Sequence, residues 1–263
     1  RFIAFSSIAI ALFGSLVWAH HMFTAGMSNT SQFVFSLLTM VVAIPSAIKV
    51  FNWTATLYKG SIELAPPMLY ALAFIFLFTI GGLTGIMQGI LTVDIQVHDT
   101  SFIVAHFHYV MFGGTGFGIF AAMHYWFPKM FARMYNLTVA KVAFWIVFVG
   151  FNTLYFPMFI MGWLGMPRRY YDYLPEFQTY HVISTIGSWI LISGILLMFY
   201  NFYRSFRSGR KIVENNIWGG ETMEWKVQTP PILENYHDVP TITDGPYDYK
   251  INDSVNLKQE VVN

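Results

Sequence analysis

The sequence contains no cysteine among its 263 residues, and only 11% of the residues carry a charge. The first absence excludes disulfide bonds, thiolate metal sites and cysteine nucleophiles, so a metal here must be bound by His, Asp, Glu or Tyr. The second excludes the charged surface of an ordinary water-soluble domain. The formal net charge is only +1, so we expect no polyanionic partner and no binding to nucleic acid.

Apolar residues dominate the composition of the chain. Hydrophobic residues make up 55% of the chain and the mean hydropathy is +0.49, which is typical of a protein embedded in membrane lipid. A helix needs about 20 apolar residues to cross a hydrocarbon core of about 30 Å. We therefore predict an all-α, polytopic transmembrane bundle with six transmembrane helices, near Phe2–Met22, Phe33–Leu57, Met68–Leu91, Ser101–Phe127, Val139–Leu164 and His181–Tyr203.

The last part of the chain differs in composition from the rest. It is rich in charged residues and contains Pro230, Pro231, Pro240 and Pro246. We expect residues 1–203 to form the membrane part and residues 204–263 a cytoplasmic-side tail that lies on a partner or on the membrane surface. The chain starts with Arg1 and shows no signal-peptide pattern, so we expect a fragment, a processed product or half of a split subunit.

The distribution of positive charge predicts the orientation in the membrane. Lys and Arg are retained on the cytoplasmic side. If the N-terminus is inside, only Arg168 and Arg169 fall outside, and the inner side collects Arg1, Lys59, Lys129, Arg133, Lys141, Arg204, Arg207, Arg210 and Lys211. Both termini are then expected on the cytoplasmic side of a bacterial inner membrane, or on the matrix side of the mitochondrial inner membrane.

This orientation places five of the eight histidines in the outer third of the membrane: His20, His21, His98, His106 and His108. Ionisable residues are costly in lipid and tend to mark functional sites. Neutral imidazole is the usual protein ligand of haem iron and also suits copper. The cluster therefore predicts a metal centre, whereas we interpret the isolated His124 and His181 as helix-packing residues.

Helical spacing constrains what these side chains can bind. His106 and His108 lie two positions apart, about 200° around a helix, so they point to opposite faces and suit two different partners. The adjacent His20 and His21 are about 100° apart and can reach one ion. Arg168 and Arg169 could bind lipid phosphates or the carboxylates of a cofactor such as haem, because the guanidinium fork pairs with both.

Several ordered segments together resemble one known family, subunit I of the haem–copper terminal oxidases, in its C-terminal half. The segments are "WAHHMF" at 18–23, "IPSAIKVFNW" at 44–53, "FLFTIGGLTG" at 76–85, "VHDTSFIVAHFHYV" at 97–110, "GMPRRYYDY" at 165–173 and "WGGETMEW" at 218–225. A single His-x-His pair would be weak evidence. The ordered set is far more specific, and it implies six helices of a larger twelve-helix subunit.

The resemblance implies a role for four histidines of this cluster, namely His20, His21, His106 and His108. His20 and His21 become two ligands of the active-site copper. His106 becomes the axial ligand of a high-spin haem and His108 an axial ligand of a low-spin haem. The helix that carries the last two would stand between the two haems.

The resemblance also implies roles for residues around this centre. His98 and Asp99 would bind magnesium together with subunit II, and Arg168 and Arg169 would pair with haem propionates. Lys49 and Ser46, three residues apart on one helical face, would belong to a proton pathway from the inner side. For Lys49 the alternative is that its side chain extends to the inner headgroups.

The implied reaction is the reduction of O2 to water coupled to proton pumping, with electrons from cytochrome c or quinol. The missing ligands would come from the N-terminal half of subunit I, and subunits II and III would be further partners. Alternatives are a nitric-oxide reductase of the same superfamily, a haem-carrying cytochrome b type subunit, and a non-catalytic structural half. Analysis of copper and haem in the purified complex separates these possibilities.

Overall fold

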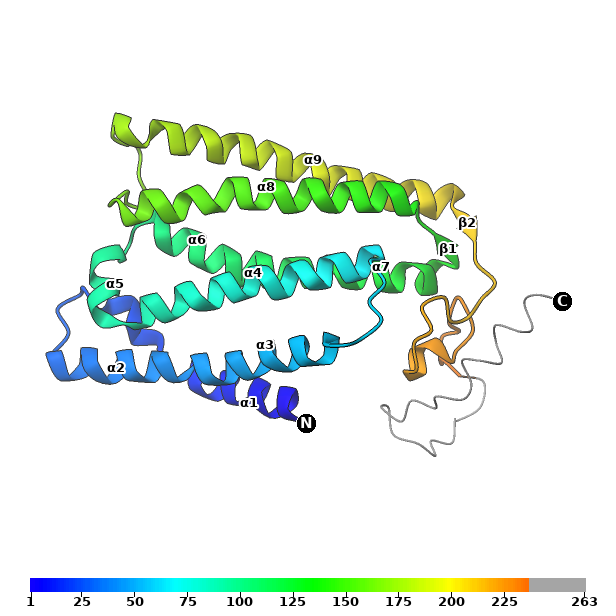
Figure 1. Cartoon of the computed structure of the whole chain (residues 1–263), viewed down its shortest axis with the longest axis horizontal. Coiled ribbons are helices and arrows are strands. Elements are labelled where there is room, and N and C mark those ends of the chain that lie inside the picture. The colour runs from blue at the N-terminus through cyan, green and yellow to red at the C-terminus, as the bar shows by residue number, and fades with distance from the viewer. Residues whose placement is uncertain (237–263) are drawn as a thin grey trace. The chain divides into compact units, whose positions relative to one another are not determined.

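The structure, a computed structural model, describes residues 1–236 and is mostly helical (Figure 1). The predicted all-α fold is confirmed, while Pro240 and Pro246 lie outside the described residues. The α-helices are α1 (Phe2–Gly14), α2 (Asn29–Val41), α3 (Ala43–Leu57), α4 (Pro66–Gly89), α5 (Leu91–Val97), α6 (Ser101–Val110), α7 (Phe117–Phe131), α8 (Leu137–Trp163) and α9 (Gln178–Ser208). A π-helical turn over Met111–Gly116 joins α6 to α7.

The chain divides into two compact units. The bundle unit comprises Arg1–Tyr125 and Leu137–Asn201, and the tail unit comprises Trp126–Asn136 together with the described residues from Phe202 onward. Helices α7 and α9 begin in the bundle unit and end in the tail unit. The histidine cluster predicted from the sequence belongs to the bundle unit.

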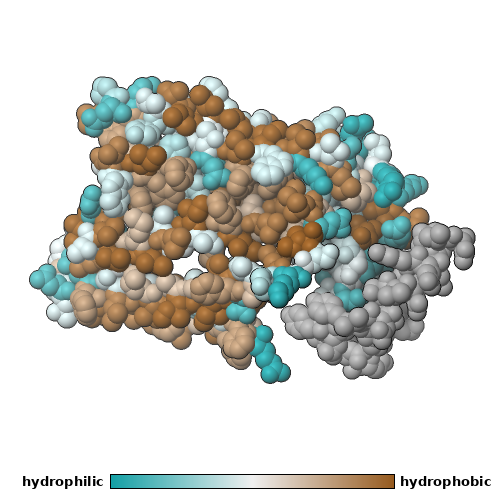
Figure 2. All heavy atoms as spheres, viewed as in Figure 1, coloured by the Kyte–Doolittle hydropathy of each residue, from teal (hydrophilic) through white to brown (hydrophobic). Residues whose placement is uncertain are grey.

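Five helical segments are long and apolar enough to cross a membrane, and hydrophobic side chains cover much of the helical surface (Figure 2). The segments are Asn29–Leu57, Pro66–Gly89, Ser101–Phe131, Leu137–Trp163 and Pro175–Ser208. The predicted sixth span, Phe2–Met22, is not confirmed, because α1 ends at Gly14 after 13 residues. At 1.5 Å per residue such a helix is about 20 Å long, less than the hydrocarbon core. Glycine is a poor helix former, and the Ser15 hydroxyl donates to the carbonyl of Leu12, which favours the helix end.

Local sequence explains where the second span is interrupted. Ser28 caps α2, since its Oγ accepts a hydrogen bond from the backbone N–H of Ser31. Pro45 has no N–H to donate to the carbonyl four residues earlier, so the hydrogen-bond ladder breaks near Val42. Helices α2 and α3 therefore form one apolar run with a break in its middle.

Helix α6 packs against both α4 and α8 in the bundle unit (Figure 1). Glycines allow the close approach of backbones. A Cβ atom at Gly162 of α8 would collide with the backbone of Phe102 in α6, and one at Gly150 would collide with the backbone of Leu191 in α9. Small residues at helix contacts are the usual means of close packing in membranes. The result is a fixed position for the helix that carries His106 and His108.

The tail unit is held together by a buried cation. Lys129 is only 4% exposed, and its ammonium donates hydrogen bonds to the carbonyls of Asn215 and Val227 and to the hydroxyl of Thr229. A short antiparallel pair, β1 (Arg133–Met134) with β2 (Arg210–Lys211), adds backbone hydrogen bonds. The described tail residues thus pack against the end of α7.

Candidate metal centre

His106 projects from α6 toward α4. Its Nδ1 lies 3.0 Å from the carbonyl oxygen of Gly81 and 3.1 Å from the hydroxyl of Thr84. Because a carbonyl can only accept, Nδ1 carries the proton and Nε2 presents a lone pair. Among the described residues Nε2 has no hydrogen-bond partner. This is the arrangement of a metal-binding histidine whose second nitrogen is oriented by the protein.

Glycines of α4 make the space for this ring. A Cβ atom at Gly85 would lie 3.0 Å from Cε1 of His106, closer than ordinary contacts allow. A Cβ atom at Gly82 would meet nothing within 4 Å. The segment "GGLTG" therefore leaves α4 without side chains at Gly82 and Gly85, beside the imidazole of His106.

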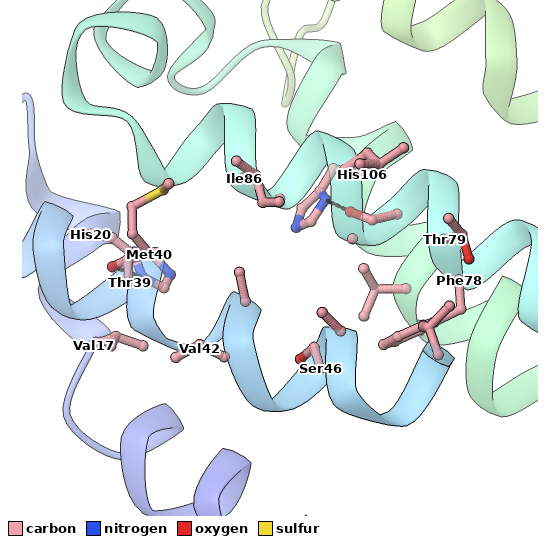
Figure 3. A pocket seen from close by; sticks show the side chains of 18 of the residues that line it. Val17, His20, Thr39, Met40, Val42, Ser46, Phe78, Thr79, Ile86 and His106 are labelled. Atoms are coloured by element: carbon pink, nitrogen blue, oxygen red, sulfur yellow. Dashed lines mark hydrogen bonds between the residues drawn. The ribbon is translucent and has the colours of Figure 1, made fainter. Parts of the chain in front are cut away.

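A cavity of about 390 Å³ opens between α2, α3, α4 and α6 (Figure 3). His106 points into it, and His20 lies with Thr39 at one end. Ser46 lines the wall formed by α3, but the half-buried Lys49, one turn further along, does not line this cavity. Most of the remaining wall is apolar, which suits a large hydrophobic ligand with one or two polar attachment points.

His20 and His21 lie in a 3-10 turn over Trp18–Met22 and not at the end of the first α-helix, as the sequence had suggested. Their Nε2 atoms are 3.1 Å apart, and Nδ1 of His20 lies 3.3 Å from the hydroxyl of Thr39. Two nitrogens bound to one tetrahedral ion at about 2.0–2.1 Å would be about 3.3 Å apart. The pair is therefore already spaced to share one ion.

The protonation state of His20 also fits a ligand. Burial, followed by repulsion from His21, His106 and His98, lowers the pKa of His20 to about 4. The ring is neutral near pH 7, and neutral imidazole is the form that binds metal. Among residues 1–236 no three His, Cys, Asp or Glu side chains come together, so the described chain offers this ion two ligands.

His108 faces α8, on the opposite side of α6 from His106. Its Nδ1 donates to the carbonyl of Val104, 2.8 Å away, and its ring stacks on Tyr155. No hydrogen bond joins its Nε2 to any described residue. The opposite-face arrangement predicted from the helical period is confirmed, and both imidazoles leave Nε2 available.

A carboxylate that the sequence analysis did not select lies beside the cluster. Asp94, only 5% exposed, accepts a hydrogen bond of 2.8 Å from Nδ1 of His98. Burial raises the pKa of Asp94, and the neighbouring His98 partly offsets this effect. The signal in the sequence was the i, i+4 spacing of Asp94 and His98 at the short helix α5.

The two loops that carry Asp99 and Arg168 are paired with each other. The Arg168 guanidinium donates to Asp99 at 2.6 Å, and its backbone N–H donates to the Asp99 carbonyl at 2.9 Å. Although burial acts in the opposite direction, this hydrogen bond and charge hold the pKa of Asp99 below its usual range. Asp99 and Arg169 both have positive φ, 53° and 60°, a conformation that clusters at functional sites in residues other than glycine.

The two predicted magnesium ligands, His98 and Asp99, each contact a different residue in the structure. His98 is bound to Asp94, and Asp99 is bound to Arg168.

The two histidines interpreted as packing residues both lie against aromatic rings. His124 stacks on Tyr70 with centroids 5.0 Å apart, and His181 lies 4.0 Å from the ring of Tyr173.

Comparisons with known proteins agree with the resemblance found in the sequence. The model of the family described as "Cytochrome C and Quinol oxidase polypeptide I" matches residues 1–190. Cytochrome c oxidase subunit 1 of Synechocystis sp. is 43% identical over 262 residues, covering 100% of this chain and 47% of that protein. Cytochrome c oxidase subunit 1 of Cereibacter sphaeroides is 44% identical, covering 90% of this chain and 42% of that protein.

The chain is also similar to a quinol oxidase subunit and to a solved oxidase structure. Quinol oxidase subunit 1 of Bacillus subtilis is 45% identical, covering 86% of this chain and 36% of that protein. The cryo-electron microscopy structure of a haem–copper terminal oxidase dimer is similar with a TM-score of 0.63 and 26% identity, over 74% of this chain and 40% of that chain. The chain spans about half the length, or less, of the curated relatives it matches.

Proposed function

The chain belongs to the cytochrome c and quinol oxidase polypeptide I family, and from this premise we propose that it forms part of the catalytic subunit of a proton-pumping terminal oxidase that reduces O2 to water. The observation that carries the proposal is the cavity lined by His20 and His106, with His21 paired to His20 and with His108 on the opposite face of α6. Packing alone would not require that two imidazoles line one largely apolar cavity and that a third lies 3.1 Å from one of them, Nε2 to Nε2.

The cavity side is the proposed site of O2 reduction. His106 would hold the iron of a high-spin haem through Nε2, while Gly81 and Thr84 fix its ring from behind. His20 and His21 would hold copper, and the remaining copper ligand would come from another part of subunit I. When bound, these metals supply the electrons and the open coordination position that O2 requires.

The opposite side of α6 is the proposed electron-entry side. His108 would hold the iron of a low-spin haem, and its second axial ligand would come from the N-terminal half of subunit I. Cytochrome c or quinol would supply the electrons, and subunits II and III would be the neighbouring chains. The relatives include oxidases named for each donor, so both donors remain within the proposal.

Arg168, Arg169, His98 and Asp99 would form the polar layer above the haems. The arginines would pair with haem propionates, and the bond of Arg168 to Asp99 supports a fixed place for its side chain. His98 and Asp99 would bind magnesium together with a group from subunit II. We also propose the inner membrane as the location, with both termini on the cytoplasmic or matrix side and six spans within a twelve-helix subunit.

Protons would reach the cavity through Ser46 and Lys49 of α3. Ser46 lines the cavity and Lys49 lies one turn further along the same helix, which supports a path through polar side chains and water. We expect Lys49→Met to retain both haem spectra but to stop turnover. Lys49→Arg should not restore activity, because arginine does not release its proton in this pH range. Oxygen consumption near that of the wild type in Lys49→Met would exclude the pathway.

Metal and haem analysis of the purified complex tests the proposal as a whole. We expect two haems and one active-site copper for each copy of this chain, and oxygen consumption with a cytochrome c or quinol donor. Iron in place of this copper, with reduction of nitric oxide, would favour the nitric-oxide reductase alternative. Haem without copper, or no haem at all, would exclude the oxidase.

A further inference from the structure

The ring of Tyr155 in α8 lies nearly parallel to the imidazole of His108. The two centroids are 4.1 Å apart and the planes differ by only 18°. We propose that Tyr155 is a positioning residue that fixes the plane of the His108 imidazole, and through it the ligand field of the low-spin haem. This inference rests on the proposed function, because it takes His108 as a haem ligand.

The other contacts of His108 show why a second support is needed. The ring of Phe107, its neighbour in α6, lies 4.5 Å away at an angle of 31° and offers no parallel face. The one hydrogen bond of His108 runs from Nδ1 to the carbonyl of Val104, one turn back in the same helix. A single hydrogen bond at one corner of a ring leaves the ring free to tilt about that corner. The flat face of Tyr155 removes this freedom, because a tilted imidazole would lose the stack or collide with it.

A neighbouring hydrogen bond holds Tyr155 in place relative to α6. The hydroxyl of Tyr109, the residue after His108, donates to Oδ1 of Asn152 at 2.8 Å. Asn152 and Tyr155 are three residues apart and share one face of α8. Tyr109 is fully buried, with its ring centroid 5.0 Å from that of Phe151. The register of α6 against α8 is therefore set next to the stack.

The ring of Tyr155, and not its hydroxyl, makes the contact with His108. The hydroxyl forms no hydrogen bond with the described residues, so phenylalanine should serve equally well at this position. The next residue, Phe156, is 52% exposed and forms no ring contact with His108. It provides a matched aromatic control on the same helix.

The consequence for the haem follows from ligand-field theory. The orientation of an axial imidazole plane determines which iron d orbitals interact with the ligand π system. That interaction sets the splitting of the orbitals in low-spin ferric iron, and hence the g values in electron paramagnetic resonance. A group that fixes the plane of a ligating histidine therefore tunes the metal without touching it.

The test compares Tyr155→Leu, Tyr155→Met and Tyr155→Phe in the assembled complex, with Phe156→Leu as the control. We expect the low-spin ferric signal to shift its largest g value and to broaden in the Leu and Met variants. It should be unchanged in Tyr155→Phe and Phe156→Leu. The reduction potential of the low-spin haem should shift in the same two variants, with the high-spin potential unchanged.

Unchanged g values and line width in Tyr155→Leu, with both haems present, would overturn the inference. If the Leu variant does not assemble, the Met variant decides by the same criterion, because its unbranched side chain adapts to the space. Failure of the proposed function is distinguishable: the low-spin signal would then persist in His108→Leu, whatever substitutions at Tyr155 do.

Discussion

The two faces of α6 differ although each presents one histidine. On the α4 face, glycines leave a cavity, and His106 is bound to the carbonyl of another helix. On the α8 face, aromatic rings fill the space, and His108 is bound to a carbonyl of its own helix. His106 therefore lies beside a cavity, whereas His108 lies against the ring of Tyr155.

This difference indicates how one helix can serve two sites with separate requirements. Under the proposed function, the site where O2 enters would need room beside its ligand, and the glycines of α4 leave that room. The site that only exchanges electrons would need a ligand held rigidly, and α8 offers the ring of Tyr155 and the hydrogen bond from Tyr109 to Asn152. A substitution on one face should therefore disturb one histidine and leave the other intact.

The largest effect is expected from Gly85→Val on the α4 face. Its Cβ alone would press on the His106 ring, and the two further methyl groups would force the ring away from its position. We expect loss or strong perturbation of the high-spin haem spectrum, with the low-spin spectrum retained. Optical spectroscopy of the reduced complex, with and without carbon monoxide, measures both.

The matched control is Gly118→Val in α7, because a Cβ atom there meets nothing within 4 Å. This variant should keep both spectra. If Gly85→Val left the high-spin spectrum unchanged, the close approach of α4 to His106 would have no functional meaning.

A smaller effect is expected from Asn152→Leu on the α8 face. It leaves the buried hydroxyl of Tyr109 without its acceptor, which costs about 1–3 kcal/mol. We expect a lower thermal stability of the complex and a perturbed low-spin signal, with the high-spin signal unchanged. Thermal unfolding followed by haem absorbance gives the stability.

Asn52→Leu is the control for this prediction, because the Asn52 amide donates only to the carbonyl of Ile48 in its own helix. Equal losses of stability in the two variants would mean that the contact between α6 and α8 gains nothing from the Tyr109 hydrogen bond.

The smallest effect is expected from Thr84→Val. The substitution removes the hydroxyl 3.1 Å from Nδ1 of His106, but the carbonyl of Gly81 still accepts from that nitrogen. The loss is that of one hydrogen bond, about 0.5–1.5 kcal/mol. A small shift of the high-spin potential alone is expected in a redox titration, and an equal shift of the low-spin potential would contradict the separation of the two faces.

The sequence predicted those features that depend on chain-local geometry. The apolar runs gave the all-α bundle, and the helical period placed His106 and His108 on opposite faces. The ordered motifs identified the family that the comparisons confirm. Each of these inferences depends on spacing along the chain and not on which segments meet in space.

Some features were missed. Asp94 and His98 are only four residues apart, but the importance of this pair appears only once the short helix α5 is seen to bring the two side chains together. Tyr155 meets His108 because α8 packs on α6, and no pattern within either helix reveals this. The early end of α1 was missed because hydropathy continues past Gly14 while the helix does not.

The most direct test of the account replaces each of the two histidines in turn. In the assembled complex, His106→Leu should lose the high-spin haem signal and keep the low-spin one, and His108→Leu should do the reverse. Electron paramagnetic resonance together with optical spectra distinguishes the two haems in a single preparation. Loss of the same haem in both variants, or retention of both haems in either variant, would contradict the claim that α6 presents two ligands to two separate irons.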